Sequence, residues 1–106
     1  MKELEQLKKL IEGYQKLIDE INSWGPQPKP MQANLDTQKS GFRQVIEMGK
    51  IIERFLVKLG PEEVAESIGM ERIQNSLITW ASQLRQTRIG LKDWEALVKK
   101  DSVKSQ

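Results

Sequence analysis

Residues 4–24, LEQLKKLIEGYQKLIDEINSW, carry the clearest structural pattern in the chain. Their apolar side chains recur every seven residues in three adjacent rows: Leu4, Ile11 and Ile18; Leu7, Tyr14 and Ile21; and Leu10, Leu17 and Trp24. Rows with this period lie along one side of an α-helix, and three of them make a stripe wider than the two-row seam of a coiled coil. The pattern predicts an amphipathic helix over residues 2–23. Gly25-Pro26 is expected to end it, because glycine suits a helix cap and proline cannot continue the hydrogen-bond ladder.

A proline-rich segment, GPQPKP at residues 25–30, follows the predicted helix. Alternating prolines favour an extended, stiff chain, so the segment is expected to be a spacer between helices. Its prolines stand at every second position and lack the P-x-x-P spacing that proline-recognising domains bind, which argues against a ligand motif. Residues 31–41 fit either a loop or an early helical turn, and we assign residues 25–41 to a spacer and loop.

Helical spacing returns over residues 42–100, which are predicted to form the helical core. Glycines and prolines divide this region into a helix from Phe42 that ends at Gly60-Pro61, a short helix at 61–68, a helix at 70–88, and a last short helix after Gly90. Residues 101–106 are polar and are expected to be frayed. No strand-like alternation of useful length occurs. The sequence therefore predicts a single all-α domain, a small bundle of four to five helices.

Two further expectations concern packing inside this bundle. Gly49 interrupts an apolar stripe, where it costs about 1 kcal/mol of helix propensity relative to alanine. Close approach of a neighbouring helix is the structural reason that we expect. Trp24, Trp80 and Trp94 each stand on an apolar stripe at helical spacing, which predicts core packing for all three; Trp24, at the end of the first helix, is the one expected to be partly exposed for a partner.

Length and composition limit the class of protein. The chain has 106 residues, of which 38% are hydrophobic and 30% are charged, and its net charge is +2. These values fit one globular domain. No apolar run approaches the roughly 20 residues of a membrane span, and the first residues lack the apolar stretch of a secretion signal. We therefore expect a cytoplasmic protein that makes no membrane contact.

Cysteine and histidine are both absent from the chain. Without cysteine there is no disulfide, zinc–thiolate site or thiol nucleophile, and without histidine the commonest general base and metal ligand is missing. The sequence also contains no glycine-rich phosphate loop and no EF-hand pattern. We therefore predict that the protein is not an enzyme, with no catalytic residues, no metal site and no cofactor.

Residues 60–83, GPEEVAESIGMERIQNSLITWASQ, resemble a helix-turn-helix motif over about 20 residues. Ala65 precedes the turn glycine, Gly69, by four residues, as is usual in that motif, and apolar residues stand beside them at Val64, Ile68 and Met70. Six residues after the turn glycine the motif normally has a buried aliphatic residue, where this chain has Asn75. Such a turn also occurs wherever two helices of a bundle form a corner.

If the motif reads DNA, the polar face of its second helix carries the side chains involved. Arginine, glutamine and asparagine are the residue types that recognise guanine and adenine edges in the major groove. The candidate DNA-binding residues are Arg72, Gln74, Asn75, Arg85 and Arg88.

The wide apolar stripe of the first helix favours a different function. It offers more apolar surface than a short domain readily covers, and exposed stripes of this kind are buried against another chain. We therefore predict a non-enzymatic protein–protein interaction or assembly module that binds a protein partner or itself, with a homodimer expected. Small bacterial or phage adaptors and inhibitors have this character, and DNA binding is the alternative. The predicted partner-binding residues are Leu4, Leu10, Ile11, Leu17, Ile18 and Trp24.

Overall fold

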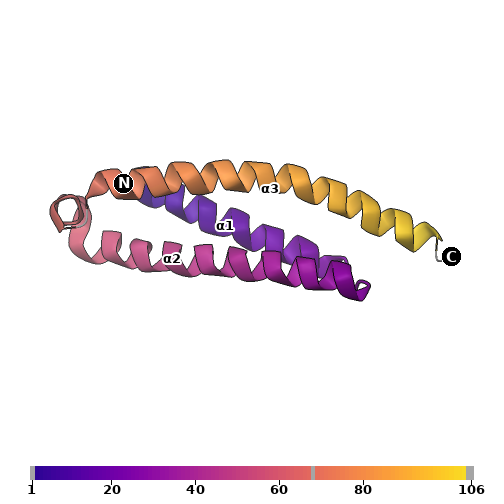
Figure 1. The fold of residues 1–106 in the computed structure, drawn as a ribbon. Coiled ribbons are helices and arrows are strands. Elements are labelled where there is room, and N and C mark those ends of the chain that lie inside the picture. Colours follow the sequence, from indigo (N-terminus) through magenta and orange to yellow (C-terminus); the bar gives the residue numbers. More distant parts are fainter. Residues whose placement is uncertain (1, 68, 105–106) are drawn as a thin grey trace.

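A computed structural model describes residues 2–67 and 69–104, and this part of the chain folds into three helices without a strand (Figure 1). They are α1 (Lys2–Ser23), α2 (Lys29–Ser67) and α3 (Met70–Lys104). The molecule is a rod of 59 × 18 × 17 Å. The all-α prediction is confirmed, whereas the predicted number of four to five helices is wrong because two of the predicted breaks do not separate helices.

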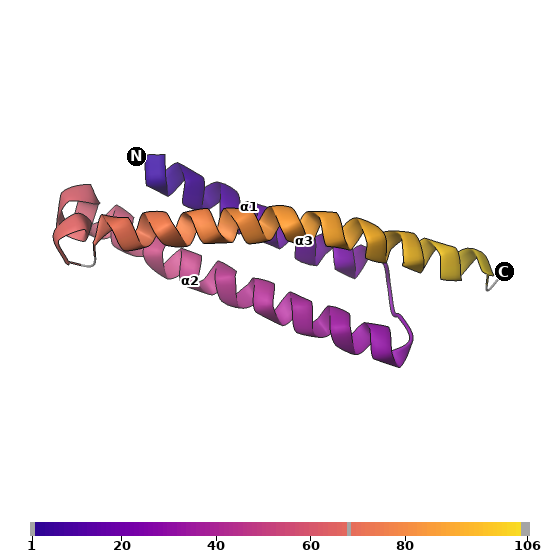
Figure 2. The ribbon, with the colours of Figure 1, turned by 45° about the horizontal axis from the view of Figure 1, so that its top comes forward.

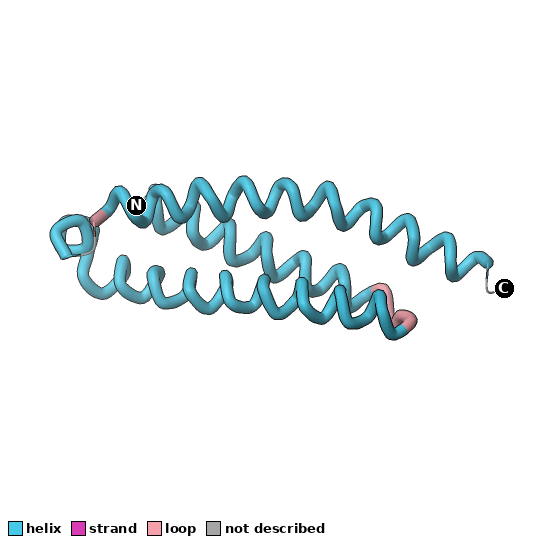
Figure 3. The backbone as a smooth tube through the Cα atoms, in the orientation of Figure 1, coloured by secondary structure: helices cyan, strands magenta, loops and turns pink. Residues whose placement is uncertain are grey.

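The helices run up, down and up. α1 and α3 point in the same direction and α2 runs opposite to both, as Figures 1 and 2 show. The two connections lie at opposite ends of the rod (Figure 3). α1 makes its most extensive contacts with α2 and fewer with α3, while α2 and α3 touch each other least. α1 is therefore the central helix of the bundle.

The prediction for α1 is confirmed at both ends. The helix spans Lys2–Ser23, and Gly25 follows it with a φ of +75°, a conformation that costs glycine little. The amide of Trp24 donates to the carbonyl of Ile21 at 3.1 Å, and that of Gly25 donates to Asn22 at 3.3 Å. These hydrogen bonds, each between residues three apart, satisfy carbonyls that the end of an α-helix leaves without partners.

The predicted spacer and loop over residues 25–41 is mostly helix, since α2 begins at Lys29. Pro30 falls in the first turn of α2, where the missing N–H has no intrahelical partner to lose. Gln27 and Gln32 close the short connection. The Gln27 side-chain amide donates to the carbonyls of Trp24 and Gly25 at 3.1 and 3.2 Å, and the Gln27 backbone amide donates to the Gln32 side chain at 2.9 Å. The connection is thus confined to residues 24–28, and Pro30 lies in the first turn of α2 instead of in a long stiff spacer.

The N-terminal half of α2 belongs to a heptad pattern that a polar residue interrupts in the sequence. Its inward positions alternate by four and three residues, and they are Met31, Leu35, Gln38, Phe42, Val45, Gly49, Ile52 and Leu56. Gln38 is polar and therefore breaks the apolar row, so the sequence shows an unbroken apolar period only from Phe42 onward. Leu35, which precedes this break, is nevertheless buried.

Gly60-Pro61 was expected to end the second helix, but the backbone of α2 remains helical to Ser67. In Figure 1 the C-terminal end of α2 turns away from the axis of the rest of the helix. Proline removes one backbone hydrogen bond and crowds the preceding turn, which bends a helix that is otherwise able to continue. The predicted short helix at 61–68 is thus the end of α2, with Ile68 outside the described residues.

α3 is one continuous helix where two were predicted. It runs through Gly90 and reaches Lys104, so the backbone of residues 101–104 is helical, while residues 105 and 106 lie outside the described part. Leu84 and Leu91, on either side of this glycine, are both buried. Their packing outweighs the cost of about 1 kcal/mol for glycine in a helix. The inward heptad positions of α3 are Ile73, Leu77, Trp80, Leu84, Thr87, Leu91, Trp94 and Val98.

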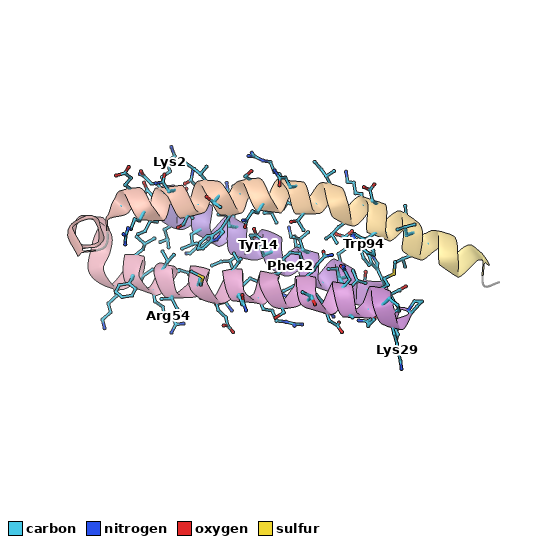
Figure 4. All side chains as sticks on the ribbon, in the orientation of Figure 1. Lys2, Tyr14, Lys29, Phe42, Arg54 and Trp94 are labelled. Carbon is cyan, nitrogen blue, oxygen red and sulfur yellow. The ribbon has the colours of Figure 1, made fainter. Side chains whose placement is uncertain are left out.

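Tyr14 joins all three helices at the centre of the core (Figure 4). Its hydroxyl donates to the backbone carbonyl of Trp80 in α3 at 3.0 Å, and its ring lies 5.8 Å from that of Phe42 in α2, centroid to centroid. Trp24, Trp80 and Trp94 pack against the same core, as predicted, but all three are only partly buried, so Trp24 does not stand apart from the other two. The buried core cluster comprises Leu7, Leu10, Tyr14, Leu17, Ile18, Ile21, Leu35, Phe42, Ile46, Leu56, Ile73, Leu77, Leu84 and Leu91.

Two glycines allow the helices to approach closely. A Cβ atom on Gly49 of α2 would lie 3.0 Å from Cγ1 of Ile11, so the expectation of a neighbouring helix there is confirmed. A Cβ atom on Gly13 of α1 would lie 2.7 Å from Cδ2 of Leu84 in α3. α1 therefore contacts α2 and α3 at distances that side chains at these two positions would prevent.

Replacing Gly69 with alanine should lower the free energy of unfolding by about 1 kcal/mol, because Gly69 has a φ of +78° and this left-handed conformation strains other residues. Gly90→Ala is the matched control. Gly90 lies inside α3 with nothing within 4 Å of an added Cβ, so alanine there should raise the unfolding free energy by about 1 kcal/mol. Urea denaturation followed by tryptophan fluorescence measures both. Equal effects of the two substitutions would contradict the structure.

Tyr14 should ionise at a higher pH in the folded protein than in the unfolded chain, because burial raises the pKa of its phenol. The folded state then binds the phenolic proton more tightly. At pH values below about 10, the usual pKa of tyrosine, the phenol of Tyr14 does not change the stability of the folded protein. As the pH rises above this value, the stability falls. Tyr14 is the only tyrosine, so phenolate absorbance reports on it alone. The same midpoint with and without denaturant would contradict the prediction.

Candidate interaction surfaces

The six predicted partner-binding residues of α1 all pack against the core of their own chain. Leu10, Leu17 and Ile18 are buried, and Leu4, Ile11 and Trp24 are partly buried against the core cluster. The reason is geometric, because a central helix needs an apolar stripe wide enough to face two neighbours. Three heptad rows provide it, with α2 on one side and α3 on the other.

Apolar side chains are exposed on α2 instead. Met48, Ile51 and Phe55 are 55%, 50% and 44% exposed. Their spacing of three and then four residues places them on one side of the helix, and we call them the α2 stripe. The other large exposed apolar residues in the described part do not form such a series; they are Val57, Ile78, Ile89 and Leu97. The α2 stripe is therefore the main uncovered apolar surface among the described residues.

The two edges of the α2 stripe differ in chemistry. Successive residues are turned by about 100° around a helix, and this places Val45 and Ile52 next to the stripe on the side that faces the core. Both are partly buried. Glu47 and Arg54 follow it on the opposite side, where both are exposed, and Figure 4 shows Arg54 on the outer side of α2. The stripe thus has one apolar edge and one edge that carries a charge of each sign.

The stripe is also hollowed. Ile51 and Phe55, together with Arg54 and Lys58, line a depression of about 310 Å³ on α2. All four lining residues belong to α2, so α3 contributes none of the lining of this depression. The sequence contains the signal for this surface, because Met48, Ile51 and Phe55 stand beside the inward heptad positions of α2. Only the heptad frame of the whole helix shows that they point outward.

A second depression lies between α1 and α3. It is a groove of about 510 Å³ whose floor includes the buried side chains of Leu10, Leu77 and Leu84, and Lys2, Lys9 and Arg88 are among its lining residues. Glu3 and Gln74 face each other across it, and the Gln74 amide donates to the Glu3 carboxylate at 3.2 Å. Hydrogen bonds from its own backbone amide and then from Gln74 lower the pKa of the Glu3 carboxyl.

The five candidate DNA-binding residues are all exposed on α3, but they do not share one side of it. Helical geometry turns Arg72 and Gln74 about 200° apart, and Asn75 lies between them on the outer side. Gln74 and Arg88 line the groove between α1 and α3.

The helix-turn-helix resemblance is preserved only in part. The turn glycine, Gly69, does separate two helices, as predicted, and has a positive φ. The second helix, however, is 35 residues long, with buried side chains from Ile73 to Val98. The first-helix residues Val64 and Ala65 belong to the end of α2, where the structure describes the backbone alone.

Within the described residues, no group of three or more acidic side chains is placed to hold a metal ion. No helix in that part is long and apolar enough to cross a membrane. Comparison of the chain with protein-family models, with curated proteins and with solved structures finds no match. The class that the geometry defines is an antiparallel three-helix bundle with an uncovered apolar stripe on its second helix.

Proposed function

We propose that this protein is a non-enzymatic helical module that acts by binding a protein, either a second copy of itself or a different chain, through the α2 stripe. One observation carries the proposal: Met48, Ile51 and Phe55 lie on one side of α2 and are each about half exposed. A contiguous apolar surface of this kind is typical of an interaction site, whereas single exposed apolar residues are common on any protein.

The spacing of the stripe suits a helical partner. Apolar anchors three and four residues apart along one helix are the pattern by which two helices pack against each other. Burial of these side chains contributes about 25 cal/mol for each Å² of apolar surface that is removed from water. The depression beside Ile51 and Phe55 offers room for a side chain of the partner.

The proposed surface differs from the one expected from sequence. The α1 residues Leu10, Leu17 and Ile18 are covered by the chain itself, so they have little apolar surface left to bury against a partner. DNA reading by α3 is the alternative function. The exposure of Arg72, Arg85 and Arg88 supports it, but the spread of the candidate side chains around the helix favours it less than one common face would.

Replacing Ile51 with aspartate should abolish retention of partner proteins from an extract of the source cells, because the charge cannot be buried in an apolar contact. Ile89→Asp is the matched control, since Ile89 is an exposed isoleucine of α3 outside the stripe. Each variant is immobilised, and the retained proteins are identified by mass spectrometry. We expect wild type and Ile89→Asp to retain the same proteins and Ile51→Asp to lose them. Equal retention by all three would reject the proposed function, and so would the absence of any retained protein from wild type together with a wild-type chain that is monomeric in solution.

A further inference from the structure

We infer that the α2 stripe is occupied by the α2 stripe of a second copy of this chain, packed antiparallel about a two-fold axis that passes near Ile51. This inference rests on the proposed function and specifies its partner. Three features of α2 carry it: the centre of the apolar stripe, the order of the charges along its outer edge, and the neutral residues that continue it toward the N-terminus of the helix.

The apolar residues are self-complementary about Ile51. Met48 lies three residues before it and Phe55 four residues after it, so an antiparallel second α2 brings Met48 of each copy against Phe55 of the other. Ile51 of one copy then meets Ile51 of the other near the axis. A two-fold interface uses the same surface on both subunits, and this stripe meets that requirement.

The charged edge selects the direction of the pairing. Glu47 and Arg54 lie on the same edge of the stripe, seven residues apart, with their midpoint beside Ile51. An antiparallel partner therefore places Glu47 of one copy opposite Arg54 of the other, and the symmetry produces this pair twice. A parallel partner would instead set this charged edge against the apolar edge formed by Val45 and Ile52. The antiparallel arrangement is favoured because it pairs opposite charges and leaves the two apolar edges facing each other.

The stripe can also be approached along its length. Toward the N-terminus of α2 it continues through Gln44 and Gly41, which are neutral; Gln44 has a flexible side chain and Gly41 has none. Gly41 is exposed, with nothing within 4 Å of an added Cβ. A second helix therefore meets no bulky or charged side chain in this row. The three apolar anchors cover less surface than the standard interface of about 800 Å² per partner, so a weak, reversible dimer is expected.

Charge reversal tests the pairing directly. In Glu47→Arg both symmetric pairs become arginine against arginine, and in Arg54→Glu both become glutamate against glutamate. Each variant alone should dimerise about tenfold more weakly or worse than wild type. An equimolar mixture of the two variants restores both opposite-charge pairs and should dimerise about as well as wild type, as should the chain that carries both substitutions. Sedimentation velocity at high micromolar concentration and low salt measures all of these species, and circular dichroism checks the fold of each variant.

Lys92→Glu and Asp93→Arg provide the matched controls, since both reverse an exposed charge on α3, away from the stripe. Each alone and their mixture should sediment like wild type. A monomeric wild-type protein, single reversals without effect, or a loss that neither the mixture nor the doubly reversed chain restores would each overturn the inference. If wild type is monomeric but retains another protein from the extract, and Ile51→Asp does not retain that protein, the second copy is rejected as the occupant and the proposed function stands.

Discussion

Replacing Tyr14 with alanine should lower the free energy of unfolding by about 3–5 kcal/mol, the largest effect that we expect from a single substitution. The ring of Tyr14 is buried at the point where α1, α2 and α3 meet, so its removal leaves a cavity that no single helix can fill by moving. A domain of this size is stabilised by about 5–15 kcal/mol in total. Urea denaturation followed by tryptophan fluorescence should show the loss as a lower midpoint.

Tyr14→Phe separates the ring from the hydroxyl. It keeps the contact with Phe42 and removes only the hydrogen bond to the Trp80 carbonyl, so it should cost about 0.5–1.5 kcal/mol. If Tyr14→Ala and Tyr14→Phe cost the same amount, the ring does not fill the centre of the bundle and the arrangement of the three helices is wrong.

Replacing Gly49 with leucine should lower the free energy of unfolding by about 2–3 kcal/mol. An added Cβ would already lie 3.0 Å from Ile11 Cγ1 and 3.4 Å from Leu7 Cδ1, so a longer side chain forces α1 and α2 apart. The higher helix propensity of leucine returns less than 1 kcal/mol of this loss. Thermal or urea unfolding measures the difference.

Gly41→Leu is the control for this substitution because Gly41 lies in the same helix and has open space around an added Cβ. It should leave stability unchanged or raise it by up to about 1 kcal/mol, measured at low protein concentration so that self-association does not contribute. A leucine that is tolerated equally at both positions would show that α1 and α2 do not approach each other at Gly49.

The periodicity of residues 4–24 was sufficient to predict α1, because all of its inward heptad positions are apolar. The longer helices were harder to predict. Gln38 in α2 and Thr87 in α3 stand at inward positions, and Gly60-Pro61 and Gly90 are residues that usually end helices. Leu35, before Gln38, and Leu91, after Gly90, are buried, and their packing against the other helices keeps these segments helical. This stabilisation by tertiary packing cannot be inferred from the local sequence.

The surface that we propose for partner binding could not be located from periodicity. The width of the α1 stripe indicates correctly that this helix has more than one neighbour, but the same pattern arises whether the neighbours belong to the same chain or to another. Met48, Ile51 and Phe55 are apolar residues in an apolar-rich helix, and their outward position depends on how α2 is rotated about its own axis in the bundle.

The sequence by itself determined that this protein is helical, because the period of its apolar residues is a local property that each segment carries along its own length. It also determined the extent of α1 and the close approach at Gly49, since a glycine within an apolar stripe has a direct steric consequence. Only the tertiary structure decided that α2 and α3 are continuous and that α1 lies between them. Only the tertiary structure, too, left the α2 stripe as the exposed apolar face. These features depend on which helix covers which surface, and this is decided by the packing of side chains that are far apart in the sequence.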